Sequence, residues 1–113
     1  MSAITTHILD VSTGSPARGV SVTLERQTTT GWEIVGKGET DEDGRLRDLL
    51  DSEAILQAEN YRLIFDTGNY FAQQQIEGFY PQVTVAFAVN DAAQHYHVPL
   101  LLSPFGYSTY RGS

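Results

Sequence analysis

Hydrophobic and polar residues alternate in short runs along the chain. Residues 20–27 give the clearest example, because Val20, Val22 and Leu24 fall on one face and the residues between them are polar. A period of two is typical of a β-strand with one buried face. Similar runs occupy residues 4–11, 32–39, 45–50, 61–68, 82–90 and 95–102, and another short strand follows the Ser-Pro turn at 103–104. The pattern therefore predicts seven to eight short strands.

Turn-forming residues separate these runs. Residues 12–19, 28–31 and 41–44 combine Gly with Ser, Thr, Asp or Pro, which are the residues that favour turns. Residues 68–79 predict one short helix, closed by Gly78 and followed by Pro81. Strands at this spacing are typical of a β-sandwich. We therefore expect an all-β sandwich of seven to eight strands with one short helix, in a single domain over residues 1–113.

Composition narrows the possible functions. The chain has 113 residues, with 7 basic and 14 acidic side chains, a formal net charge of −7 and a pI of about 4.7. This acidic balance argues against binding of nucleic acid or of anionic membranes, and no apolar run approaches the roughly 20 residues of a membrane span. The absence of cysteine excludes disulfides and thiolate chemistry. Because residues 1–11 also lack the pattern of a secretory signal, we expect a cytoplasmic protein.

The strand at 95–102 brings chemistry-bearing side chains to one face. Alternation puts Tyr96, Val98, Leu100 and Leu102 in the core and leaves His95, His97, Pro99 and Leu101 on the outer face. An apolar patch that the core does not cover is typical of a subunit interface. In the first strand, His7 likewise falls on the outer face. Two histidine-bearing outer faces therefore point to a site near an oligomer interface.

Three stretches carry a resemblance to a known family: TTHILDVSTGSPARGVSVTL near the start, DEDGRL in the middle and HYHVPLLLSPFGYSTYRGS at the end. They resemble the transthyretin-like family over nearly the whole chain, and specifically its enzyme branch, the 5-hydroxyisourate hydrolases. The final Tyr-Arg-Gly-Ser separates that branch from the thyroid-hormone carrier, which lacks it. The resemblance implies a transthyretin-like homotetramer with active sites in clefts between dimers. It also implies hydrolysis of 5-hydroxyisourate to 2-oxo-4-hydroxy-4-carboxy-5-ureidoimidazoline in urate degradation.

The resemblance also assigns roles to individual residues. The catalytic histidines fall on His7 and His97, and the catalytic arginine falls on Arg45, directly after the Asp-Gly turn, rather than on Arg47. His95 lies next to the site without a catalytic role. The tetrapeptide that the resemblance assigns to substrate binding falls on Tyr110, Arg111, Gly112 and Ser113.

These residue types suit the hydrolysis of a cyclic amide. An imidazole has an unperturbed pKa of about 6.5 and can take a proton from water near neutral pH, which fits His7 and His97. A guanidinium offers hydrogen-bond donors in a rigid fork to a carbonyl oxygen that gains negative charge, which fits Arg45 and also Arg111. The scheme requires neither a metal nor a cofactor.

The last four residues are expected to fold into the active-site cleft. The preceding strand, Ser-Pro turn and strand would deliver them beside the outer face, and Gly112 would allow a close approach of the backbone. Tyr110 and Ser113 suit the positioning of a planar, polar heterocycle. The alternative is that Arg111 is a solvated cation and Ser113 a disordered end.

Other interpretations stay open. Each of the two candidate histidines can be structural, and His7, His95 and His97 could chelate a metal, although no cysteine or flanking carboxylate accompanies them in that strand. The acidic turn at 41–44 is too short for an EF-hand loop. The whole chain could be a small-molecule carrier that uses the inter-dimer channel, which the Tyr-Arg-Gly-Ser ending argues against. It could also be a carbohydrate-binding sandwich module, which the missing secretory signal argues against.

Overall fold

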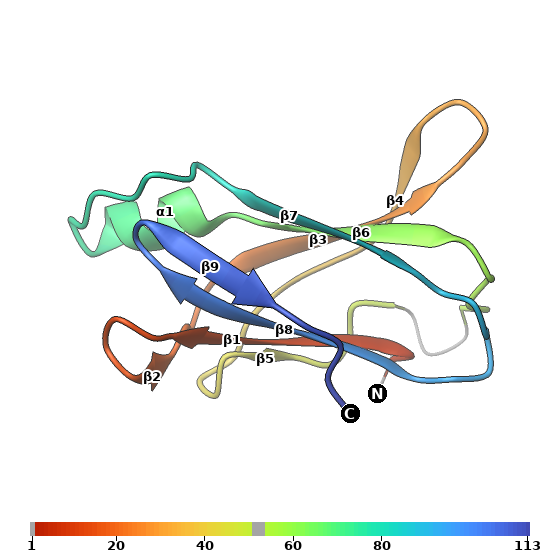
Figure 1. The fold of residues 1–113 in the computed structure, drawn as a ribbon, viewed down its shortest axis with the longest axis horizontal. Coiled ribbons are helices and arrows are strands. Elements are labelled where there is room, and N and C mark those ends of the chain that lie inside the picture. The colour runs from red at the N-terminus through yellow and green to blue at the C-terminus, as the bar shows by residue number, and fades with distance from the viewer. Residues whose placement is uncertain (1, 51–53) are drawn as a thin grey trace.

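The computed structural model describes residues 2–50 and 54–113, which form nine strands and one helix (Figure 1). The strands are β1 (Ile4–Asp10), β2 (Ser15–Pro16), β3 (Ser21–Gln27), β4 (Trp32–Glu39), β5 (Arg45–Leu46), β6 (Asn60–Phe65), β7 (Val83–Ala88), β8 (Tyr96–Ser103) and β9 (Gly106–Thr109). The helix is α1 (Thr67–Gln73). The predicted all-β fold with one short helix is confirmed, and the additional strands β2 and β5 have only two residues each.

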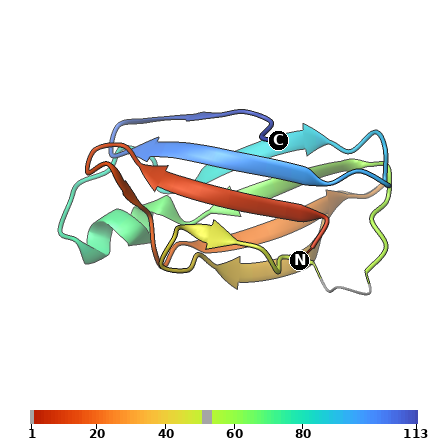
Figure 2. The same ribbon diagram turned by 90° about the horizontal axis from the view of Figure 1, so that it is seen from below.

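The strands form two sheets that pack face to face. The four-stranded sheet has the order β4-β3-β6-β7, and the five-stranded sheet has the order β2-β1-β8-β9, with β5 also pairing with β1. All neighbours are antiparallel except β1 and β8, which run parallel. Figure 2 shows the five-stranded sheet with β8, β1 and β5 side by side, and with the C-terminal tail beyond β8. This order decides which side chains meet on the outer face of the sheet.

Alternating side chains build the core between the sheets, as the period of two predicts. Val22 and Leu24 on β3 and Leu100 on β8 are almost fully buried. The remaining core side chains come mainly from β1, β6, β7 and β8 and from the buried Phe71 of α1. Burial of these apolar side chains is the main favourable contribution to folding. No helix within residues 2–50 and 54–113 is long and apolar enough to cross a membrane.

The helix α1 is shorter than the sequence predicts. Its first turn is capped by Asp66, whose side chain accepts the N–H of Asn69 at 3.3 Å. It ends at Gln73, five residues before Gly78, because the N–H groups of Gln74 and Ile76 both turn back to the carbonyl oxygen of Phe71. The prediction that Gly78 closes the helix was therefore wrong.

The run at residues 45–50 is also shorter as a strand than expected. Only Arg45 and Leu46 pair with β1. The chain then leaves the sheet, and Leu49 and Leu50 bury their side chains in the core from an irregular segment. Their hydrophobic character reflects this burial and not strand pairing.

Candidate active site

The outer face of the five-stranded sheet brings the candidate residues together in two adjacent rows. The parallel pairing of β1 and β8 places Thr5 opposite His97 and His7 opposite Pro99. On the other side of β1, β5 places Arg45 opposite His7. Because side chains alternate along a strand, all five residues lie on the face that points away from the core. Strands that are far apart in the sequence lie side by side (Figure 2) and together supply this face.

A tight turn positions Arg45 on this face. The carboxylate of Asp41 accepts the backbone N–H groups of Asp43 and Arg45 at 2.8 and 3.0 Å. Gly44 has a φ of 73°, and a Cβ there would collide with the carbonyl oxygen of Ile8, so the position requires glycine. The Gly44 carbonyl oxygen accepts the N–H of Ile8 at 2.8 Å, which holds the turn against β1. The Asp-Gly sequence thus fixes the strand from which the guanidinium extends.

A pocket of about 250 Å³ opens on this face. It is lined by residues that include two histidines and two arginines: Thr5, Thr6, Arg45, Arg47, His95, His97 and Ser113. His7 lies in the adjacent row, beside Arg45. The structure therefore brings together His97, Arg45 and Ser113 from the predicted set, with His7 next to them, and it adds Thr5, Arg47 and His95.

Thr5 is the residue that sequence reasoning missed. Its side chain is nearly buried, with 4% of its surface exposed. Its hydroxyl oxygen lies 2.8 Å from Nδ1 of His97 and 3.3 Å from Nε2 of His95. Alternation alone places Thr5 on the outer face, but only the parallel register of β1 and β8 reveals that it faces His97.

The electrostatic surroundings favour the neutral form of His97. Burial is the main cause that lowers the pKa of His97 below its ordinary value of 6.5, and the positive charge of Arg45 and the neighbouring His7 and His95 lower it further. A backbone hydrogen bond with Thr5 opposes this shift in part. At neutral pH, His97 is therefore a neutral imidazole that can accept a proton.

The C-terminal tail packs directly against His97. The N–H of Gly112 donates to the carbonyl oxygen of His97 at 2.8 Å. A Cβ on Gly112 would lie 2.6 Å from Cδ2 of His97 and 3.1 Å from Cγ of Pro99. This is the close backbone approach that the sequence predicts for Gly112.

The tail also buries Pro99. The sequence places Pro99 on an uncovered outer face, but it is buried within the single chain because the tail covers it. The β8–β9 ladder is interrupted at Pro99, between the pairs Leu100–Thr109 and His97–Gly112. The missing N–H of proline therefore breaks no ladder hydrogen bond.

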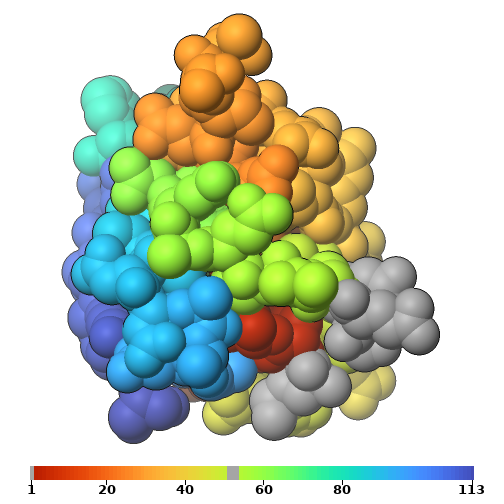
Figure 3. All heavy atoms as spheres, turned by 90° about the vertical axis from the view of Figure 1, so that its right-hand side faces the viewer, coloured from red at the N-terminus to blue at the C-terminus, as the bar shows by residue number. Residues whose placement is uncertain are grey.

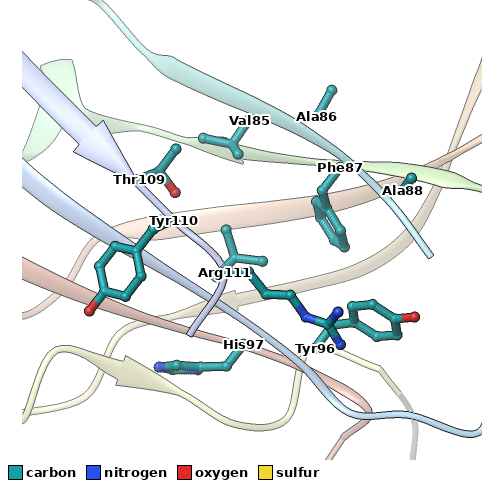
Figure 4. A pocket seen from close by; sticks show the side chains of 10 residues that line it. Val85, Ala86, Phe87, Ala88, Tyr96, His97, Thr109, Tyr110 and Arg111 are labelled. Carbon is teal, nitrogen blue, oxygen red and sulfur yellow. The ribbon is translucent and has the colours of Figure 1, made fainter. Parts of the chain in front are cut away.

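The four residues of the tail divide between two sides. Figure 4 shows the rings of Tyr110 and His97 pointing to one side, while Arg111 extends to the other. The Arg111 guanidinium lies over the ring of Tyr96, 4.5 Å from its centroid, and donates to the side-chain oxygen of Gln94 at 2.9 Å. Figure 3 shows the same neighbourhood from the end of the molecule, with the tail in dark blue below the loop before β8. In the single chain, Arg111 therefore faces away from the pocket that Ser113 lines.

A second pocket of about 200 Å³ lies on that other side of the tail, between β7 and β8 (Figure 4). Its walls are mainly apolar and aromatic, including Val85, Phe87 and Tyr96, with Arg111 at its edge. His97 and Arg111 also line this pocket, but Figure 4 shows the His97 ring and the Arg111 side chain pointing to opposite sides. Within the described ranges, no three His, Asp or Glu side chains are close enough to hold a metal ion, and this covers the trio of His7, His95 and His97.

Comparison with known proteins adds to this geometry. The model of the HIUase/Transthyretin family matches residues 4–112. The chain belongs to this family. A 5-hydroxyisourate hydrolase of Salmonella typhimurium is 47% identical over 110 residues, which cover 97% of this chain and 80% of that protein.

Two solved structures with different names share the fold of this chain. The 5-hydroxyisourate hydrolase of Klebsiella pneumoniae superposes with a TM-score of 0.85 at 40% identity, covering 97% of this chain and 98% of that chain. Sea bream transthyretin in complex with thyroxine superposes with a TM-score of 0.91 at 33% identity, covering 98% of this chain and 95% of that chain. Because a hydrolase and a thyroxine-binding protein share the fold, the side chains of the pocket must decide between the two functions.

Proposed function

We propose that this protein hydrolyses 5-hydroxyisourate to 2-oxo-4-hydroxy-4-carboxy-5-ureidoimidazoline, a step of urate degradation. The observation that carries the proposal is that His97 and Arg45 line the same pocket, and the lowered pKa of His97 suits a base. The similarity to proteins named 5-hydroxyisourate hydrolases supports the same substrate. A base and a cation around one pocket are what the hydrolysis of a cyclic amide needs.

The reaction begins with activation of water. His97 removes a proton from water as the water oxygen bonds to the ring carbonyl carbon of the substrate. The carbonyl electron pair moves to oxygen, and the guanidinium of Arg45 donates hydrogen bonds to the resulting oxyanion. No metal or cofactor enters this scheme, so treatment with a chelator should leave the rate unchanged.

The second half of the reaction opens the ring. The oxyanion reforms the carbonyl, the carbon–nitrogen bond breaks, and the released nitrogen takes the proton that His97 carries, becoming part of the ureido group. His7 lies beside Arg45 and supplies a second imidazole for proton transfer. The new carboxylic acid loses its remaining proton to solvent, and the resulting carboxylate faces the cations of the pocket until it is released.

The tail completes the substrate-binding part of the proposal. Ser113 lines the pocket and Gly112 contacts His97, and both support the assignment of residues 110–113 to substrate binding. Arg111 contacts Tyr96 and Gln94, which supports a role in holding the tail. Direct contact of Arg111 or Tyr110 with substrate stays a prediction. Deletion of residues 110–113 should abolish hydrolysis and leave a folded sandwich, and an undiminished rate would contradict this assignment.

We further propose that the working form is a homotetramer with its sites between subunits. Among the described residues, β7 and β9 each pair with one strand only, so a second copy can extend both sheets. Val11 and Phe105 are large apolar side chains that are 49% and 67% exposed, which suits burial by another subunit. An aspartate at Leu101 on the outer face should reduce both assembly and activity. Sedimentation that shows a fully active monomer would contradict the proposed tetramer. The cytoplasmic location of the protein is a separate prediction.

The competing function is that of a carrier, which the likeness to thyroxine-bound sea bream transthyretin favours. The two functions separate in an assay with 5-hydroxyisourate generated freshly from urate, followed by its absorbance. A hydrolase accelerates the decay far above the spontaneous rate at catalytic concentrations of protein. A carrier binds flat aromatic ligands and leaves the decay unchanged.

A further inference from the structure

The Thr5 hydroxyl lies between two imidazoles. It is 2.8 Å from Nδ1 of His97 and 3.3 Å from Nε2 of His95. A hydroxyl has one proton to donate and two lone pairs to accept with. It can therefore donate to only one of the two rings at a time, so the hydrogen bonds of His95 and His97 are coupled through it.

Only one arrangement of these protons leaves His97 able to act as a base. The Thr5 hydroxyl occupies Nδ1 of His97, so Nε2 is the ring nitrogen left to take a proton from water, and the neutral ring must then carry its proton on Nδ1. The Nδ1–H of His97 then donates to the Thr5 hydroxyl oxygen. The hydroxyl proton is left to point at Nε2 of His95.

We propose that Thr5 is a positioning residue that holds His97 in the tautomer with the proton on Nδ1. The Thr5 hydroxyl oxygen accepts this Nδ1–H, and its own proton is donated to Nε2 of His95. Nε2 of His97 is then unprotonated and is the atom that takes the proton from water. The tautomer with the proton on Nε2 could not act as a base at that atom. The catalytic part of this inference rests on the proposed function.

Other charged and titratable groups around His97 act on the same equilibrium. They are His7 on β1, Arg45 on β5, Arg47 directly after β5, and His95 before β8. The tail contributes Ser113 to the pocket, and Arg111 is turned to the other side. Positive charge on Arg45, His7 or His95 opposes protonation of His97, whereas Thr5 favours the imidazolium by accepting its Nδ1–H. Removal of the Thr5 hydroxyl should therefore lower the pKa of His97, whereas removal of a neighbouring positive charge should raise it.

The first test replaces the hydroxyl with a methyl group of similar size. In Thr5→Val we expect kcat to fall by about 10- to 100-fold, as for other residues that orient a histidine, with KM changed much less. The acid limb of kcat/KM should move to lower pH because the imidazolium loses an acceptor. Thr5→Ser keeps the hydroxyl and should restore both kcat and the pH profile. Thr23→Val, on β3 of the other sheet, is the matched control and should change neither.

The second test reads the tautomer directly and does not depend on the substrate. Nitrogen NMR of the His97 ring should show the proton on Nδ1 in the native protein. Thr5→Val should show a larger fraction with the proton on Nε2, and His95→Phe should do the same to a smaller extent, because the Thr5 hydroxyl is then free to donate to Nδ1.

The outcomes separate the two proposals. An unchanged tautomer and pH profile in Thr5→Val overturn the positioning role of Thr5, and so does a loss of activity that only parallels a loss of stability. A native protein that does not accelerate 5-hydroxyisourate decay overturns the proposed function. The NMR experiment then still tests the hydrogen bonds between Thr5, His95 and His97.

Discussion

The two ends of β1 differ in what their buried polar groups contact. At the carboxyl end, the carboxylate of Asp10 is surrounded by hydrogen-bond donors from its own chain. At the amino end, the Thr5 hydroxyl contacts two imidazoles that line a pocket. Asp10 accepts the phenol O–H of Tyr70 at 2.8 Å and the backbone N–H and side-chain O–H of Ser12. It thereby ties α1 and the turn after β1 to the sheet. Thr5 instead contacts His97 and His95, which line the pocket.

The buried polar side chains of Asp10 and Thr5 therefore serve two different purposes in one strand. A polar group whose partners are all inside the fold stabilises that fold, and its loss leaves the partners unpaired. A polar group whose partners face a pocket sets the orientation and protonation of groups that can meet a ligand. The amino end should therefore govern activity and the carboxyl end should govern stability.

The largest effect is expected at Arg45. Arg45→Lys keeps the charge but loses the planar fork of donors, so kcat/KM should fall by about 10²–10³-fold, with the melting temperature nearly unchanged. Steady-state kinetics and thermal melts measure both. Arg18→Lys is the control, because Arg18 is an exposed residue paired with Glu42 at 3.7 Å. Near-native activity in Arg45→Lys would reduce Arg45 to a general electrostatic contribution.

The next effect is expected at the other end of β1. Asp10→Ala leaves the Tyr70 phenol and the Ser12 donors unpaired, so the free energy of unfolding should fall by about 3 kcal/mol. The activity per folded molecule should stay close to native. Chemical denaturation measures the first quantity, and Asp43→Ala on the exposed turn serves as control. A stable but inactive Asp10→Ala protein would contradict the division.

A smaller effect is expected where the tail meets His97. In Gly112→Ala, the new methyl group would lie 2.6 Å from Cδ2 of His97, so the ring must move. We expect kcat to fall by about 10- to 100-fold, with little loss of stability because the tail lies at the edge of the sheet. Gly106→Ala is the matched control, since its Cβ would meet only the Ser103 hydroxyl at 3.8 Å. Equal activity of the two variants would show that tail contact does not orient His97.

The smallest effect concerns Tyr70. Tyr70→Phe removes one hydrogen bond to Asp10 and should cost about 1 kcal/mol. Burial and the hydrogen bond to Asp10 raise the pKa of Tyr70 above 10.0 in the folded protein. Its contribution to stability is thus fully present below pH 10 and is lost as the pH rises through the folded pKa. Unfolding measured from pH 8 to 11 should show this loss in the native protein and a smaller loss in Tyr70→Phe.

Sequence pattern predicted the sandwich because alternation is a local property. Leu100 and Leu102 could be assigned to the core from their own strand alone, and His97 to the outer face. The early end of α1 was not predictable in this way, because the carbonyl oxygen of Phe71 and not a glycine decides where the helix turns.

The site was predictable only in part. His7, Arg45 and His97 were assigned by family resemblance, and their proximity depends on the register of β1 with β5 and β8. Thr5 carries no motif and becomes visible only through its distances to two imidazoles. The direction of Arg111 depends on Tyr96 and Gln94, and no local pattern encodes that contact.

The most direct test of the catalytic role of His97 is the decay of freshly generated 5-hydroxyisourate at neutral pH with the native protein and with His97→Asn, alongside a thermal melt of each. We expect strong acceleration by the native protein and a loss of about 10²–10⁴-fold in His97→Asn, with both proteins melting at nearly the same temperature. A His97→Asn protein that hydrolyses the substrate at the native rate, or a native protein that leaves the spontaneous decay unchanged, would contradict this role.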